Sequence, residues 1–348
     1  MKKLLSLVLA ISLVLPMVMA AHVGTGIGVD IETEDFAPIV WQCDNRVVYD
    51  DGLQPDLYGY DDLGYRTANY AFEGEAIEWE VLVMDKNGIG KIEDVFATIG
   101  DDQGEGNDIE VNCHESDHAG EVLSSCNARI GEEELVGQGD WDSNVMKYYK
   151  CTLTVETPES MYGEYWITVE AIDLDGLSGT MDENEYWFLN PEIALSIEGD
   201  LTFEDVRPGT ESYSETLLIG NDADDSSGVR LDMFISGSHF YDSSSSGAMC
   251  PNTNELNLEN FAYSALNGPH DTMDTCGDAE GYCEINVGDQ ITEAARIMDG
   301  ENYGDGGLEF RNLLSPGAEM ALTFRLDLPE PCNGDFDTGQ IFFWGEAI

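Results

Sequence analysis

The stretch Glu78-Trp79-Glu80-Val81-Leu82-Val83-Met84-Asp85-Lys86-Asn87-Gly88-Ile89 decides the fold class of this 348-residue chain. A second stretch, Tyr165-Trp166-Ile167-Thr168-Val169-Glu170-Ala171-Ile172-Asp173-Leu174-Asp175-Gly176-Leu177, repeats its pattern. In both, a run of β-branched and aromatic residues leads into Asp-x-(Asn/Asp)-Gly and then an aliphatic residue. Such runs favour strands, and Asn-Gly or Asp-Gly supplies the positive φ that hairpin turns require. Each stretch therefore predicts a strand that ends in a tight turn.

The rest of the chain shows the same short apolar runs separated by turn residues, with little helical pattern. Strands are expected at residues 76–84, 91–99, 146–155, 164–172, 185–189, 213–219, 229–235, 319–328 and 340–344. We predict an all-β chain of two β-sandwich domains, with a boundary at Leu189-Asn190-Pro191, where a strand ends at a proline. The predicted parts are a signal peptide at 1–20, an N-terminal strand or extension at 21–34, and domains at 35–190 and 191–348, the second with an insertion at 242–307.

Both predicted domains resemble known exported modules. The two strand-turn units of the first domain resemble the immunoglobulin-like modules of bacterial and archaeal surface proteins. The second domain has a Val206-Arg207-Pro208-Gly209 turn, a strand ending at Asn221, and two C-terminal strands. It resembles the camelysin and biofilm-fibre proteins and the related archaeal bundling pilins. That resemblance implies a jelly-roll-like sandwich that polymerises by lending a strand to its neighbour, although residues 242–307 depart from the family pattern.

The first twenty residues have the features of a secretory signal peptide. Lys2 and Lys3 precede an apolar run from Leu4 to Leu15, and Val18-Met19-Ala20 forms a small-residue exit. This pattern predicts cleavage after Ala20 and a secreted protein at the cell surface. No later run approaches the roughly 20 apolar residues of a membrane-spanning helix, so no transmembrane segment is expected.

The chain is strongly acidic, with 14 Lys and Arg against 70 Asp and Glu and a formal net charge of -56. Nucleic acid is excluded as a partner, because binding it requires cations that displace counterions from phosphates. Self-repulsion of this size calls for screening by salt or bound divalent ions. Hydrophobic residues make up 42% of the chain, which is enough to build a core and argues against disorder.

Eight cysteines behind a signal peptide, four in each half, predict disulfides formed in an oxidising compartment. Four cysteines allow three pairings in each domain, and the sequence does not choose among them. The favoured pairs are Cys113–Cys126, Cys276–Cys283, Cys43–Cys151 and Cys250–Cys332. Cys113, His114, His118 and Cys126 also have the residue types of a zinc site, but their spacing fits no common one.

No cofactor is obligatory on this reading, and calcium is the one that the acidic loops suggest. The candidate ligands are Asp173, Asp175 and Asp182 in one loop and Asp222, Asp224 and Asp225 in another. Carboxylate oxygens at this density suit Ca²⁺, and the alternative is that they are solvated. Asp85 to Ile92 imitates the start of an EF-hand loop, but Phe96 stands where the bidentate glutamate is needed.

Catalytic signatures are absent from the sequence. It contains no His-Glu-x-x-His, no Gly-x-Ser-x-Gly and no glycine-rich phosphate loop with lysine. We therefore predict that the protein is not an enzyme.

The predicted start of the mature chain alternates apolar and small residues. Val23, Thr25, Ile27, Val29 and Ile31 are separated by Gly24, Gly26, Gly28 and Asp30. A strand with one apolar edge and one nearly bare edge can add to the open sheet of another copy and build filaments. The alternative is that it pairs within its own domain, the default for sequential strands.

These features favour a secreted structural subunit of the cell surface, of an extracellular matrix or of a filament. Self-association or binding to other surface proteins is expected, with strand donation as a candidate mechanism. The alternative is a monomeric adhesin that recognises a glycan or a protein through loops such as 242–307.

Overall fold

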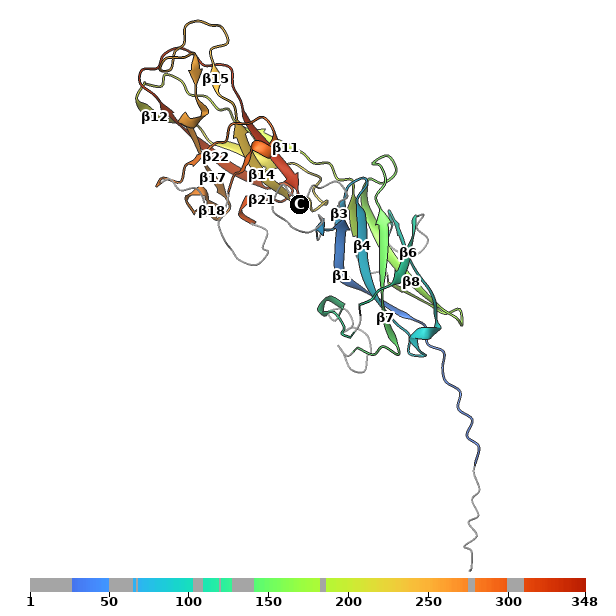
Figure 1. The fold of residues 1–348 in the computed structure, drawn as a ribbon. Coiled ribbons are helices and arrows are strands. Elements are labelled where there is room, and N and C mark those ends of the chain that lie inside the picture. Colours follow the sequence, from blue (N-terminus) through green and yellow to red (C-terminus); the bar gives the residue numbers. More distant parts are fainter. Residues whose placement is uncertain are drawn as a thin grey trace, which may run out of the picture. The chain divides into compact units, whose positions relative to one another are not determined.

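The computed structural model describes residues 27–49, 65–66, 68–102, 109–118, 120–126, 141–181, 186–274, 279–298 and 310–348. The chain divides into two units, Met1–Asp35 and Phe36–Ile348. The predicted signal peptide lies outside the described residues. The second unit is built mainly of strands, with short 3-10 turns and an α-helical turn at residues 124–126 between them, so the predicted all-β fold is confirmed (Figure 1).

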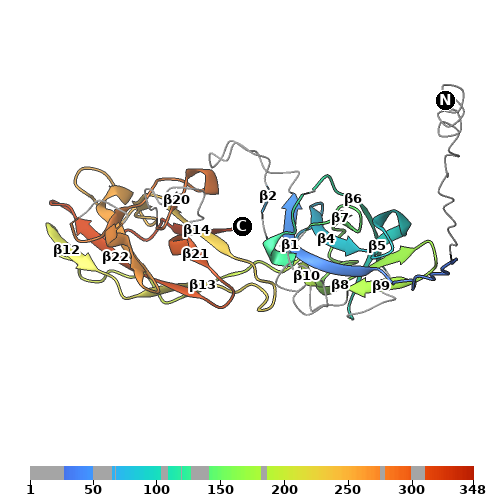
Figure 2. The same ribbon diagram turned by 90° about the horizontal axis from the view of Figure 1, so that it is seen from below.

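Among the described residues, ten strands precede residue 190: β1 (Ile39–Tyr49), β2 (Tyr65–Arg66), β3 (Tyr70–Ala71), β4 (Ala76–Met84), β5 (Ile92–Gly100), β6 (Ile109–Glu115), β7 (Met146–Thr154), β8 (Gly163–Asp173), β9 (Ser178–Met181) and β10 (Tyr186–Leu189). They run in the order β2-β1-β4-β7-β6-β5-β8-β10-β3, with β9 beside β8. Figure 2 labels all of these strands except β3. Residues 109–112 of β6 pair with β5, and residues 113–115 pair with β7. This strand therefore passes from one layer of the sandwich to the other.

The space between these layers is filled by side chains from both. Trp79 of β4, Ile99 of β5, Ile167 of β8 and Trp187 of β10 are fully buried in one core cluster. The opposite face of β4 is buried as well, because Leu82 lies in a second cluster with Tyr148 and the segment around Cys126. Burial on both faces explains why Val81 to Met84 is continuously apolar rather than alternating.

In the described part of the chain after residue 190 there are thirteen strands: β11 (Leu195–Glu198), β12 (Thr210–Tyr213), β13 (Leu217–Asn221), β14 (Leu231–Gly237), β15 (Phe240–Tyr241), β16 (Glu255–Leu256), β17 (Phe261–Asn267), β18 (His270–Asp271), β19 (Cys283–Glu284), β20 (Ala295–Arg296), β21 (Leu313–Leu314), β22 (Glu319–Leu328) and β23 (Ile341–Ala347). The larger sheet has the order β11-β13-β22-β17-β18, and a smaller sheet is formed by β20, β14, β21 and β23. Ile219, Met233 and Phe324 are fully buried in their common core.

Two details of this part differ from expectation. The strand expected at 213–219 is two strands, β12 and β13, which both pair with β22. The stretch 242–307, expected as an insertion, supplies β17, which pairs with β22 over six residues and so belongs to the main sheet. The domain boundary near Pro191 stays a prediction.

Two of the predicted disulfides are wrong. The structure joins Cys43 to Cys126 and Cys113 to Cys151, instead of Cys43 to Cys151 and Cys113 to Cys126. Cys113 and Cys151 are register partners on β6 and β7, with Cα atoms 4.1 Å apart. The side chain of Cys151 lies in the core between the layers, whereas that of Cys43 lies on the outer face of β1. Because neighbouring residues of a strand point to opposite faces, Cys43 and Cys151 cannot meet.

The third predicted bridge, Cys250–Cys332, is confirmed. Cys283 is disulfide-bonded. Its predicted partner, Cys276, lies outside the described residues.

Candidate functional site

The N-terminal segment exposes the apolar residues of the alternating pattern. Residues 27–38 belong to no helix or strand. Ile27 is 91% exposed, Val29 77% and Ile31 76%. Pairing of this segment within its own domain stays the alternative prediction, and residues 21–26 lie outside the described residues.

The two strand-turn units that define the fold place two buried carboxylates together. Asp85 is fully buried, and its Oδ1 accepts the N–H of Asn87 at 2.7 Å. Asp173 is 1% exposed, and its Oδ1 accepts the N–H groups of Asp175 and Leu177 at 3.0 and 2.8 Å. Both aspartates therefore cap their own turns, which is the reason for the repeated Asp-x-x-Gly pattern.

A lysine links the turns. The N–H of Leu174 donates to the carbonyl of Lys91 at 2.8 Å, and Lys91 Nζ lies 2.5 Å from Asp175 Oδ2. Asp85 Oδ2 is buried and has no hydrogen-bond partner among the described residues. Burial raises the pKa of Asp85, and the charges of Asp173 and Asp175 raise it further, against the opposing effects of the Asn87 hydrogen bond and the Lys91 charge.

This burial predicts that Asp85→Asn stabilises the protein at neutral pH by about 1 kcal/mol, because the amide keeps the Oδ1 acceptor and removes a buried charge. An acid whose pKa is raised by folding favours the folded state at low pH, and this contribution is lost as the pH rises above 3.8 through the folded pKa. Urea unfolding between pH 4 and 8 should show a gain that grows with pH.

Asp94→Asn is the control, because it removes the same charge from an exposed position on β5. An equal gain from Asp94→Asn would show that general charge relief is responsible. A less stable Asp85→Asn protein at pH 7 would contradict the prediction.

The second acidic loop is also organised by its own hydrogen bonds. Asp224 Oδ2 accepts the hydroxyl of Tyr162 at 3.1 Å and the N–H of Glu192 at 3.0 Å. Asp222 and Asp225 are exposed, and Asp182 lies outside the described residues. Within the described ranges, no group of three or more His, Cys, Asp or Glu side chains is arranged to hold a metal ion. Calcium binding stays a prediction.

The zinc interpretation fails for a chemical reason. Cys113 and Cys126 are both in disulfides and cannot act as thiolate ligands. His118 instead lies with its Nδ1 3.5 Å from Glu80 Oε2, and its ring is 4.7 Å from that of Tyr148.

A polar cavity of 390 Å³ adjoins this histidine. It is lined by Glu80, Glu115, Ser116, Asp117, His118 and Lys150. Glu80 is 2% exposed and accepts a hydrogen bond from Ser116 Oγ at 2.7 Å, and Lys150 Nζ lies 2.9 Å from Glu78. Polar groups of both signs in a concave site are suited to hydrogen-bond a small polar ligand.

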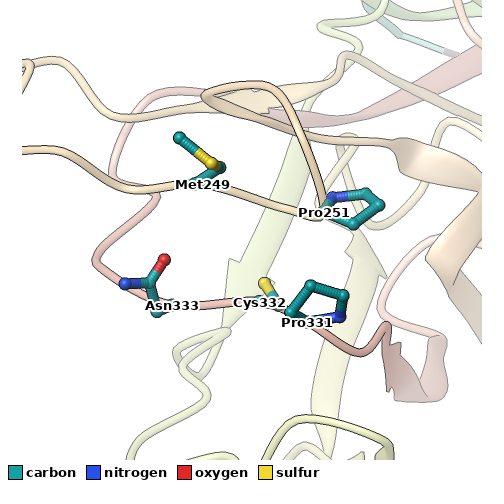
Figure 3. Close-up of a pocket in the computed structure, with 5 residues that line it drawn as sticks. All are labelled: Met249, Pro251, Pro331, Cys332 and Asn333. Atoms are coloured by element: carbon teal, nitrogen blue, oxygen red, sulfur yellow. The ribbon is translucent and has the colours of Figure 1, made fainter.

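A second cavity, of 360 Å³, lies beside the Cys250–Cys332 bridge and is lined by Met249, Pro251, Pro331, Cys332 and Asn333 (Figure 3). Its lining has no charged group. This cavity therefore offers mainly apolar surface, with Asn333 as a polar side chain in its lining. No helix among the described residues is long and apolar enough to cross a membrane.

No protein-family model and no curated protein sequence matches the chain. Among solved structures, it aligns with the C-terminal domain of the AgI/II polypeptide BspA of Streptococcus agalactiae at 11% identity, over 89% of this chain and 97% of that one, with a TM-score of 0.31. A chaperone–tip adhesin complex of CFA/I fimbriae aligns at 10% identity, over 90% of this chain and 77% of that one, with a TM-score of 0.22.

Proposed function

We propose that the protein is an extracellular structural subunit that assembles with further copies by donating its N-terminal segment. The observation that carries this proposal is the exposure of Ile27, Val29 and Ile31, which alternate with Gly28 and Asp30. Three described disulfides support an oxidising compartment such as the cell exterior.

The driving force is burial of these three side chains. Covering one such aliphatic side chain is worth about 1.5–3 kcal/mol, so the segment offers enough apolar surface for a specific contact. Main-chain hydrogen bonds along an open sheet edge add to it and fix the register. Because the full sequence has a formal charge of -56 and every copy is strongly acidic, assembly requires salt or divalent cations such as Ca²⁺ to screen the repulsion.

The test compares polymerisation of matched variants of the mature protein. The unsubstituted protein should form polymers in high salt or with calcium, as seen by light scattering and negative-stain microscopy. The double variant Ile27→Asn/Val29→Asn should stay monomeric, because it places amides on the apolar row. Asp30→Asn introduces the same residue on the opposite row and should assemble like the unsubstituted protein.

Polymers that form equally well with the double variant would remove strand donation. An unsubstituted protein that stays monodisperse under all these conditions would favour the second candidate, a monomeric adhesin. The polar cavity around Glu80 and His118 favours that candidate as a ligand site.

A further inference from the structure

The last strand of the chain, β23, lies at an open edge of its sheet. In the part of the chain that the structure describes, β23 pairs with β14 alone. All seven residues of β23 are only partly buried. An edge strand of this length presents a row of unpaired backbone groups to any strand that can reach it.

The hydrogen-bond register between β23 and β14 shows which backbone groups of β23 face away from β14. The N–H of Ile348 donates to the carbonyl of Arg230, and the N–H of Ser238 donates to the carbonyl of Gln340. The even-numbered residues along this strand therefore direct their backbone groups toward β14. In an antiparallel pair, the residues between them direct their N–H and C=O groups the other way. The backbone groups of Ile341, Phe343 and Gly345 therefore point outward from the sheet edge.

The facing sheet extends beyond this edge. Its outermost strand, β11, pairs Ile197 with Ile219, which is fully buried in the core. Register partners share a face, so Ile197 points inward, yet it is 55% exposed. Leu195 of the same strand lies against Gly345, 3.2 Å from the place where a Cβ would stand. Strand β11 is therefore covered by β23 at Leu195 and uncovered at Ile197.

We propose that this open edge, formed by β23 and Ile197, receives residues Ile27–Ile31 of another copy. The inference rests on the proposed function and names the partner surface for it. A strand added beside β23 would hydrogen-bond to the outward groups of Ile341, Phe343 and Gly345, and its apolar row would cover Ile197.

The donated segment matches this edge in length and in shape. Five extended residues span about 17 Å, which fits within the seven residues of β23. The side chains of Ile341 and Phe343 pack against the core, so Ile27, Val29 and Ile31 would continue the same face. On the other face, Phe342 and Trp344 lie with ring centroids 6.1 Å apart, and Gly28 leaves room beside them.

The experiment measures binding of a labelled peptide of residues 21–34 to mature protein lacking residues 21–31, by fluorescence anisotropy. The peptide should bind this truncated protein, and Ile197→Asp should weaken binding at least about tenfold, since a charge replaces the apolar floor of the site. Val287→Asp is the control, because Val287 is also 55% exposed but lies on the side of β14 away from β23. It should change affinity less than about twofold.

The outcomes separate this inference from the proposed function. Equal binding to the Ile197→Asp protein, or no binding to the truncated protein, would overturn the open edge as the receiving site. Polymers of the full mature protein that still depend on Ile27 and Val29 would leave strand donation itself intact. The full-length protein could be monomeric and fail to bind the peptide while the truncated protein binds it. This result would show that each copy fills its own edge, which also overturns the inference.

Discussion

Replacing Trp79 by alanine is expected to lower the free energy of unfolding by about 3–5 kcal/mol, the range for deleting a large buried aromatic side chain. Trp79 is fully buried between the layers of the first sandwich and is the register partner of Cys151. Because small domains are stable by only about 5–15 kcal/mol, this loss should be visible as a large fall in the midpoint of guanidinium unfolding.

Trp79→Phe is the matched control for this prediction. The indole Nε1 of Trp79 is buried and has no hydrogen-bond partner among the described residues. Phenylalanine keeps an aromatic ring and removes the unsatisfied donor, so its cost should be within about 1 kcal/mol. A loss from Trp79→Phe as large as that from Trp79→Ala would contradict this prediction and show that the indole itself makes the stabilising contact.

The strands with the clearest alternation and turn signals are the ones that the sequence predicts well. The predicted bounds of β4 and β22 agree with the structure at both ends. The sequence does not predict β1, because Asp44-Asn45 has the composition of a turn, whereas the structure accommodates a register shift between Cys43 and Val47 within one strand. A bulge depends on the partner strand, which local propensity does not contain.

Strand β17 is also not predicted from its local sequence. Phe261 to Asn267 contains the alternation of a strand, but it lies in a stretch rich in Gly, Asp and Cys that reads as an insertion. Its place in the main sheet is set by pairing with β22, about 60 residues later in the chain. Pairing at that distance is decided by the packed core rather than by composition.

One half of the candidate assembly site can be predicted from the sequence and the other half cannot. Its donor row is visible in the sequence as Ile27, Val29 and Ile31 separated by small or polar residues. The receiving edge is not visible there, because Ile197 has the pattern of an ordinary inward residue. Ile197 is exposed because the smaller sheet, opposite β11, ends at β23 and does not cover it. This is a property of the assembled sandwich.

The pairing of the cysteines depends on which face of the sheet each side chain occupies. Cys43 is the register partner of Glu80, and Cys151 is the register partner of Trp79. Glu80 and Trp79 are adjacent on β4 and point to opposite faces, so the two cysteines belong to different cores. Cys43 therefore needs a partner from the segment that covers the outer face, and Cys126 supplies it.

The covering segment, residues 120–126, is held by this bridge and by Tyr148. The N–H of Leu123 donates to the Tyr148 hydroxyl at 2.9 Å, and Tyr148 donates to the carbonyl of Glu121 at 3.2 Å. Trp141 stacks on the Tyr148 ring, with the ring centroids 5.3 Å apart. If the Cys43–Cys126 bridge were removed, these contacts alone would have to hold the covering segment over apolar side chains such as Leu82.

Removing the tie with Cys43→Ala/Cys126→Ala is expected to cost about 4 kcal/mol, because the bridge closes a loop with a sequence separation of 83 residues. Hydrogen exchange followed by mass spectrometry should show that the covering segment loses protection at Leu123. Cys250→Ala/Cys332→Ala is the control, since it opens a loop of nearly the same separation, 82 residues, in another core. It should leave exchange at Leu123 unchanged, because the contacts of residues 120–126 lie in the core cluster of Trp41, Leu82 and Tyr148. Full protection of Leu123 in the first double variant, or peptide mapping that joins Cys43 to Cys151, would contradict the assignment of this bridge as the tie.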